Sequence, residues 1–142
     1  MNESDLAQAY RATTYQLTVN GQQVPVRIGE PAGEMAVHLP QVNAQSWAFI
    51  TAWNPHSNIL SAPENARRNA RLFQQLAAKA YAPAIAIPDS TDWPREPGFV
   101  VFDIPLTELL ALAETHEQHA VVVGQNGGAP ELIWVGKAAT AE

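Results

Sequence analysis

The apolar and polar positions of the chain switch repeatedly between a strand-like and a helix-like pattern. Residues 14–28 alternate on either side of Asn-Gly at 20–21, which is the strongest short signal for a β-hairpin. Pro25 places the second strand of this hairpin at the edge of a sheet. Residues 47–53 are almost all apolar, aromatic or β-branched, which predicts a central strand that is buried on both faces.

Helical patterns lie between the strands. A short helix is expected at residues 4–12, and another at 106–117, where leucines recur with helical spacing. Residues 61–64, Ser-Ala-Pro-Glu, have the spacing of a capping box with proline in the first turn, and predict a helix that runs to about Tyr81. Residues 35–39 are expected to form a short strand or a turn.

The order of these elements indicates the fold class. Further strands are expected at residues 84–87, 99–104, 120–124 and 132–135. From residue 47 to 124 the order is therefore β-α-β-β-α-β, which is the split βαβ order of a ferredoxin-like core. We predict one α+β domain over residues 1–142, with an N-terminal helix and hairpin, an extra C-terminal strand, and flexible tails at 1–3 and 137–142. The alternative is a three-layer α/β sheet, because the long loop at 88–97 leaves room for a crossover.

Composition narrows the class of protein. The 142 residues include no cysteine, which excludes disulfides, thiolate metal sites and thiol nucleophiles, and the formal net charge of −6 argues against nucleic-acid binding. The start of the chain lacks the basic and apolar segments of a secretory signal, and no apolar run approaches the roughly 20 residues of a membrane helix. We therefore predict a soluble cytoplasmic protein without membrane contact. His116 and His119 are a weak zinc signal, and neither a metal nor a cofactor is predicted.

The predicted helix after residue 61 has a face that changes character. Traced back from Leu72, its apolar side becomes polar at Arg68 and Asn65. Buried polar groups are costly without partners, so this end either reaches solvent or lines a polar cavity. The preceding strand and loop bring further polar side chains to the same corner, which gives a candidate site for a small anionic ligand at Thr51, Asn54, Ser57, Asn65 and Arg68. The competing interpretation is that these amides and hydroxyls only hold the loop in place.

A second candidate group supports an enzyme. Trp93 and Glu96 lie in an acidic, proline-rich loop, where Glu96 or a nearby aspartate could act as acid or base. Gln125 and Asn126 are secondary candidates for orienting a substrate, and no residue is assigned as catalytic. In a ferredoxin-like sheet we expect strand 47–53 to run opposite to the strands at 84–87 and 120–124. Glu96 and Gln125 would then lie roughly 23 Å from Asn54, too far for one small active site unless loops fold over. A parallel arrangement would bring these groups closer.

A third hypothesis is a protein-interaction or dimerisation domain. Tryptophans at 47, 53, 93 and 134 could serve as aromatic anchors, and open sheet edges could pair with a second copy. A homodimer is therefore one of the predicted states.

Several of these segments also resemble a known family. Residues 49–57, Phe-Ile-Thr-Ala-Trp-Asn-Pro-His-Ser, followed by Glu-Asn-Ala-Arg-Arg-Asn at 64–69, resemble a bacterial family known as domain of unknown function 3293. The resemblance extends from about Leu6 to Val135 and includes Trp93, Glu96, Gln125 and Asn126. Pro97-Gly98 departs from the small polar residue and apolar strand expected after the glutamate. The resemblance implies no activity.

Overall fold

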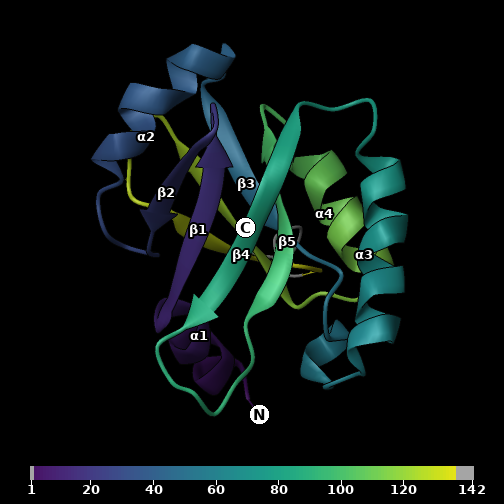
Figure 1. Ribbon diagram of the computed structural model, residues 1–142. Coiled ribbons are helices and arrows are strands. Elements are labelled where there is room, and N and C mark those ends of the chain that lie inside the picture. Colours follow the sequence, from purple (N-terminus) through teal and green to yellow (C-terminus); the bar gives the residue numbers. More distant parts are fainter. Residues whose placement is uncertain (1, 137–142) are drawn as a thin grey trace.

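Residues 2–136 are described by the computed structural model, and within them one seven-stranded sheet carries helices on both sides (Figure 1). The strands are β1 (Thr13–Val19), β2 (Gln22–Val26), β3 (Ser46–Ile50), β4 (Tyr81–Pro88), β5 (Glu96–Phe102), β6 (Ala120–Gln125) and β7 (Glu131–Trp134). The helices are α1 (Glu3–Arg11), α2 (Gly33–His38), α3 (Ala62–Gln75) and α4 (Leu106–Thr115), with short 3-10 turns η1 (Leu39–Val42) and η2 (Pro55–Ser57).

The sheet is antiparallel throughout, in the order β2-β1-β4-β5-β3-β6-β7. The predicted hairpin is confirmed, with Pro25 in the edge strand β2, and β3 lies in the centre between β5 and β6. β4 and β5 pair directly with each other, so the crossover that the alternative three-layer sheet required is wrong. The α+β class is confirmed.

Two apolar cores lie on opposite faces of this sheet, and β3 contributes to both. Its side chains alternate, so that Trp47 and Phe49 face one core while Ala48 and Ile50 face the other. The second core is covered by α3 and α4, which lie side by side in Figure 1. The first is enclosed by the β1–β2 hairpin, which curls over it, together with α2.

Some element boundaries differ from the sequence-based expectation. Residues 35–39 belong to α2 and η1 rather than to a strand, and α3 ends at Gln75, before Tyr81. Asn2 caps α1 and Glu3 begins it, whereas the tail expected at 137–142 lies, with residue 1, outside the described residues. None of the helices in the described part combines the length and apolar character needed to cross a bilayer.

The strand directions place the ends of some strands and the starts of others at one edge of the sheet. β3 and β4 run the same way, because each is antiparallel to β5 between them, so the prediction that strands 47–53 and 84–87 run in opposite directions is wrong. The opposite direction predicted for the strand at 120–124 is confirmed, because β6 is antiparallel to β3. The ends of β3 and β4 therefore lie beside the starts of β5 and β6. β1 also starts there, since Thr13 pairs with Pro88, and Figure 1 shows α1 below this edge.

Candidate functional site

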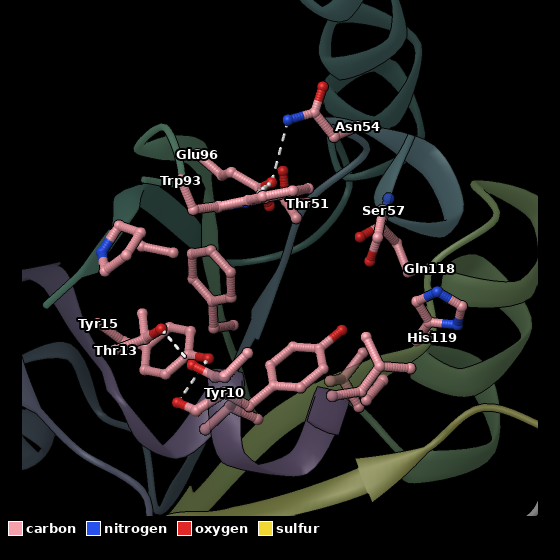
Figure 2. Close-up of a pocket in the computed structure, with 18 of the residues that line it drawn as sticks. Tyr10, Thr13, Tyr15, Thr51, Asn54, Ser57, Trp93, Glu96, Gln118 and His119 are labelled. Carbon is pink, nitrogen blue, oxygen red and sulfur yellow. Dashed lines mark hydrogen bonds between the residues drawn. The ribbon is translucent and has the colours of Figure 1, made fainter. Parts of the chain in front are cut away.

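A cavity of about 260 Å³ opens at this edge of the sheet. Figure 2 shows Thr51, Trp93 and Glu96 on one side of it, Tyr10, Thr13 and Tyr15 on another, and Ser57, Gln118 and His119 on a third. Much of the remaining wall is apolar and comes from the sheet, α1 and the loop before β5, including Leu6, Ala9, Phe49, Ala86, Pro94 and Val122. The cavity is thus mostly apolar with a few polar groups, as ligand sites usually are.

Glu96, the first residue of β5, carries the carboxylate of this cavity. Its Oε2 accepts hydrogen bonds from the indole Nε1 of Trp93 at 2.8 Å and from the amide Nδ2 of Asn54 at 3.1 Å. Burial raises the pKa of the Glu96 carboxyl, and these two hydrogen bonds act in the opposite direction. Glu96 makes no ion pair with any described residue.

Asn54 is held by the start of α3. Its backbone N–H donates to Oδ1 of Asn65 at 2.8 Å, and its own Oδ1 accepts from Nδ2 of Asn65 at 2.8 Å. The backbone N–H of Leu60 donates to the same Oδ1 at 3.0 Å. The polar face of the helix therefore fixes the amide that reaches Glu96.

The loop that contains Asn54 has an unusual backbone. Asn54, His56 and Ser57 have φ of 46°, 49° and 62°, in the left-handed region that non-glycine residues seldom adopt. The backbone N–H of His56 donates to the carbonyl of Glu117 at 2.7 Å, and Nε2 of Gln118 donates to the carbonyl of Trp53 at 3.3 Å. Such conformations persist where surrounding contacts enforce them, and they concentrate at functional sites.

The Pro97-Gly98 sequence fits closely against the end of β3. Oγ1 of Thr51 donates to the carbonyl of Pro97 at 2.6 Å, and Nδ2 of Asn69 donates to the same carbonyl at 2.9 Å. A Cβ at Gly98 would lie 2.7 Å from the carbonyl oxygen of Ile50, which is too close for any other residue without a backbone shift. This close contact holds the start of β5, and with it Glu96, against the end of β3.

Two tyrosines form the wall nearest α1. Burial raises the pKa of both Tyr10 and Tyr15 well above the usual range, so both hydroxyls are neutral at physiological pH. The hydroxyl of Tyr15 donates to the carbonyl of Tyr10 at 3.4 Å. The ring of Tyr10 packs edge-on against Trp134, with ring centroids 6.1 Å apart.

Histidines contribute little metal-binding capacity. The rings of His56 and His119 lie 5.2 Å apart at the cavity wall, whereas His116 points away and hydrogen-bonds to Gln75. Burial, followed by the charges of Arg68 and Arg71, lowers the pKa of His116. Within residues 2–136 no three His, Asp or Glu side chains are grouped so that they could hold a metal ion.

Comparison with protein families gives one match. The model of the family described as "Protein of unknown function (DUF3293)" matches residues 50–121. The chain belongs to this family. No curated protein and no solved structure matches it.

The DUF3293 match runs from the end of β3 to the start of β6 and contains most of the predicted site. Thr51, Asn54 and Ser57 line the cavity together with the secondary candidates Trp93 and Glu96. The expectation that Glu96 is remote from Asn54 is therefore wrong, and the two side chains are hydrogen-bonded.

Other predicted residues lie elsewhere in this DUF3293 protein. Asn65 is buried behind Asn54 and does not line the cavity. Arg68 lies in a separate hollow with Arg71 and His116, and its buried Nε has no hydrogen-bond partner among the described residues. Gln125 pairs with Ser46 at the opposite end of β3, and Asn126 follows it there. These four residues thus do not share the cavity.

Several lining residues were not predicted from the sequence. Tyr10 and Tyr15 come from α1 and β1, outside the DUF3293 match, and Gln118 and His119 come from the turn before β6. The sequence contained one usable signal for Gln118 and His119. A strand antiparallel to β3 must begin where β3 ends, so the residues just before β6 lie at the Asn54 edge.

Proposed function

We propose that the protein binds a small molecule in this cavity and that Glu96 acts on it as a general acid–base group. The observation that carries the proposal is a carboxylate at the wall of a mostly apolar cavity, held by two donors on a single oxygen. Trp93 and Asn54 both reach Oε2, and no described residue donates to Oε1. One carboxylate oxygen is therefore oriented by the protein while the other remains available to a bound molecule.

The environment of Glu96 suits proton transfer. A carboxyl whose pKa is raised by burial exchanges a proton closer to neutral pH than an exposed glutamate does. Carboxyls that lie in a cavity and have a pKa shifted by burial are candidates for catalysis. In this proposal Asn54 and Trp93 are positioning residues, which fix the carboxylate through their hydrogen bonds.

An anionic ligand at the same corner has less support. The residues that line the cavity include no lysine or arginine, and Arg68, the cation expected there, lies in the separate hollow. The carboxylate of Glu96 would repel an anion. The contacts of Asn65 with Asn54 fit the interpretation that the helix amides hold the loop.

The proposal is tested by incubating the protein with a bacterial metabolite extract and comparing metabolite levels by mass spectrometry. We expect at least one metabolite to be consumed by the wild type and spared by Glu96→Gln, whose amide oxygen can still accept from Trp93 and Asn54. Glu131→Gln, an exposed change of the same charge in β7, is the control. Consumption by neither protein, or equally by both, would contradict acid–base catalysis by Glu96.

We also propose that the core of the sheet is ferredoxin-like. The order β4-β5-β3-β6, with α3 and α4 against one face, supports a ferredoxin-like split βαβ core extended by β1, β2 and β7. A cytoplasmic location, a bacterial source, a homodimer and the absence of nucleic-acid binding stay predictions.

A further inference from the structure

The cavity is unusual in the balance of its charges. It contains the carboxylate of Glu96 and no lysine or arginine. Arg27, the nearest cation in the hairpin, is engaged by Asp89 at 2.9 Å and by Glu30 at 3.6 Å. Arg95 precedes Glu96 in the chain, but it is exposed and does not line the cavity.

A buried carboxylate without a cationic partner is costly to keep ionised. The protein gives Glu96 two neutral donors, which offset only part of this cost, because burial still raises its pKa. A positive charge beside Oε1 would supply the cationic partner that Glu96 lacks among the described residues. Across the cavity, His119 lies on the side of Ser57 and Gln118 (Figure 2), and the ring of His56 is 5.2 Å from that of His119.

Aromatic side chains surround the same space. Phe49, Trp93, Tyr10 and Tyr15 line the cavity, and the rings of Tyr15 and Phe49 lie 5.1 Å apart. Aromatic rings attract a cation held within about 6 Å of the ring centre, and clusters of rings recognise ammonium groups in this way. The aromatic residues and the carboxylate therefore favour the same kind of ligand.

The volume limits the size of that ligand. A cavity of about 260 Å³ is just below the roughly 300–1,000 Å³ of typical ligand pockets, which suits a small organic molecule. The apolar wall suits a hydrocarbon or aromatic body rather than a sugar or a phosphate.

We infer that the ligand of this cavity is a small organic cation, a protonated amine on an apolar body, with its ammonium group at Glu96. This inference rests on the proposed function, in that it assumes that the cavity binds a small molecule. It adds the chemical class of that molecule, which neither the family nor the fold assigns.

The test uses three probes of nearly equal size on the full chain: 2-phenylethylamine, 2-phenylethanol and phenylacetate. At pH 8 the amine is a cation, the alcohol is neutral and phenylacetate is an anion, so the three probes differ mainly in charge. Binding is followed by NMR through the indole N–H of Trp93, which donates to Glu96. Its signal is identified as the one lost in Trp93→Phe.

We expect the amine to shift the Trp93 signal and to bind roughly tenfold tighter or more than the alcohol, since only the ammonium adds the attraction of a full positive charge to its hydrogen bond with the carboxylate. Glu96→Gln should remove this preference, while Glu131→Gln should change neither affinity. An amine that does not bind, that binds no tighter than the alcohol, or that binds Glu96→Gln equally well overturns the inference. The comparison of probes on the wild type decides the question even if Glu96→Gln does not fold.

These outcomes are separable from the test of the proposed function. Tight binding of the alcohol or of phenylacetate would overturn the cationic class while leaving a ligand cavity in place. Selective amine binding, together with no metabolite consumption, would support the cationic class and contradict catalysis by Glu96.

Discussion

Asn54 uses the polar atoms of its side chain entirely within the protein. Oδ1 accepts from Asn65 and from the backbone of Leu60, and Nδ2 donates to Glu96. It is also 3 % exposed, so these hydrogen bonds are shielded from water in the folded protein. A residue that the sequence suggested as a ligand contact is thus, in the structure, the link between α3 and the carboxylate.

The first prediction concerns this link. Asn54→Ala should lower the free energy of unfolding by about 1–3 kcal/mol, because it removes the acceptor of the Leu60 backbone N–H, one of the two bonds made by Nδ2 of Asn65, and a donor to Glu96. Urea denaturation measures the change. Asn58→Ala, an exposed asparagine in the same loop, is the control and should shift stability by less than about 0.5 kcal/mol. Equal effects of the two substitutions would show that the amide network contributes nothing.

The second prediction concerns the pH dependence due to Glu96. Because its pKa is higher in the folded protein than in the unfolded chain, the folded state binds more protons between these two values. The stability associated with Glu96 is therefore fully present below the unfolded pKa of about 4.3 and is lost as the pH rises through the folded pKa.

The measurement compares the unfolding free energy of the wild type with that of Glu96→Gln from pH 4 to pH 8. The wild type should lose stability relative to Glu96→Gln as the pH rises, since glutamine does not titrate. A difference between the two proteins that is constant with pH, or that changes in the other direction, would refute the raised pKa.

At the level of elements, the start of α3 was predictable and its end was not. Ser61 accepts from the backbone N–H of Glu64, as the capping-box spacing indicated. The apolar spacing continues beyond Gln75, but Tyr81 pairs with Val101 and the chain must turn before it reaches the sheet. Pairing with a strand distant in sequence therefore ends the helix. The local spacing of apolar residues does not indicate that pairing.

The segment around α2 is a second such case. A strand or turn was expected there, but Met35 and Leu39 are both fully buried at a spacing of four residues, while Val37 between them is 62 % exposed. That is a helical pattern rather than the alternation of a strand. In the sequence, Met35, Val37 and Leu39 are apolar at every second position, so only the exposure of Val37 in the structure distinguishes the helix from a strand.

The third prediction tests the contact between β5 and the end of β3. Gly98→Ala should destabilise the protein by about 1–3 kcal/mol, the usual cost of overpacking, because its Cβ would lie 2.7 Å from the carbonyl oxygen of Ile50 and 2.9 Å from Cβ of Thr51. It should also move Glu96, so the indole N–H signal of Trp93 should shift in the NMR spectrum.

Gly33→Ala is the matched control, since a Cβ there meets nothing within 4 Å. Thermal denaturation of both variants gives the comparison. If Gly98→Ala were as stable as Gly33→Ala and left the Trp93 signal in place, β5 would not approach β3 as closely as the structure indicates.

At the scale of the whole molecule, the site depends on which strand ends lie at the same edge of the sheet. The prediction placed Thr51, Asn54 and Ser57 correctly at one corner, because the polar helix face and the end of the strand are close in sequence. It misplaced Glu96 because the direction of β4 relative to β3 was taken the wrong way, although two strands antiparallel to a common neighbour must be parallel to each other. The contribution of Tyr10 depends on how α1 packs beneath the sheet, and no local pattern specifies that packing.

The last prediction is that residues 2–136 unfold as one cooperative unit. Its two cores lie on opposite faces of the sheet but share β3, so neither is expected to unfold without the other. Leu17→Ala in one core and Leu109→Ala in the other should each cost about 2–5 kcal/mol, since both leucines are almost completely buried.

Urea unfolding is followed by tryptophan fluorescence, to which the buried Trp47 of the first core contributes, and by far-UV circular dichroism, to which α3 and α4 over the second core contribute. For a single domain the two transitions coincide in the wild type, and each substitution shifts both midpoints together. If Leu109→Ala lowered the midpoint seen by circular dichroism and left the fluorescence midpoint unchanged, the faces would unfold independently. The cavity depends on both faces of the sheet, because β3 supplies Phe49 to its wall from one face and Ile50 from the other.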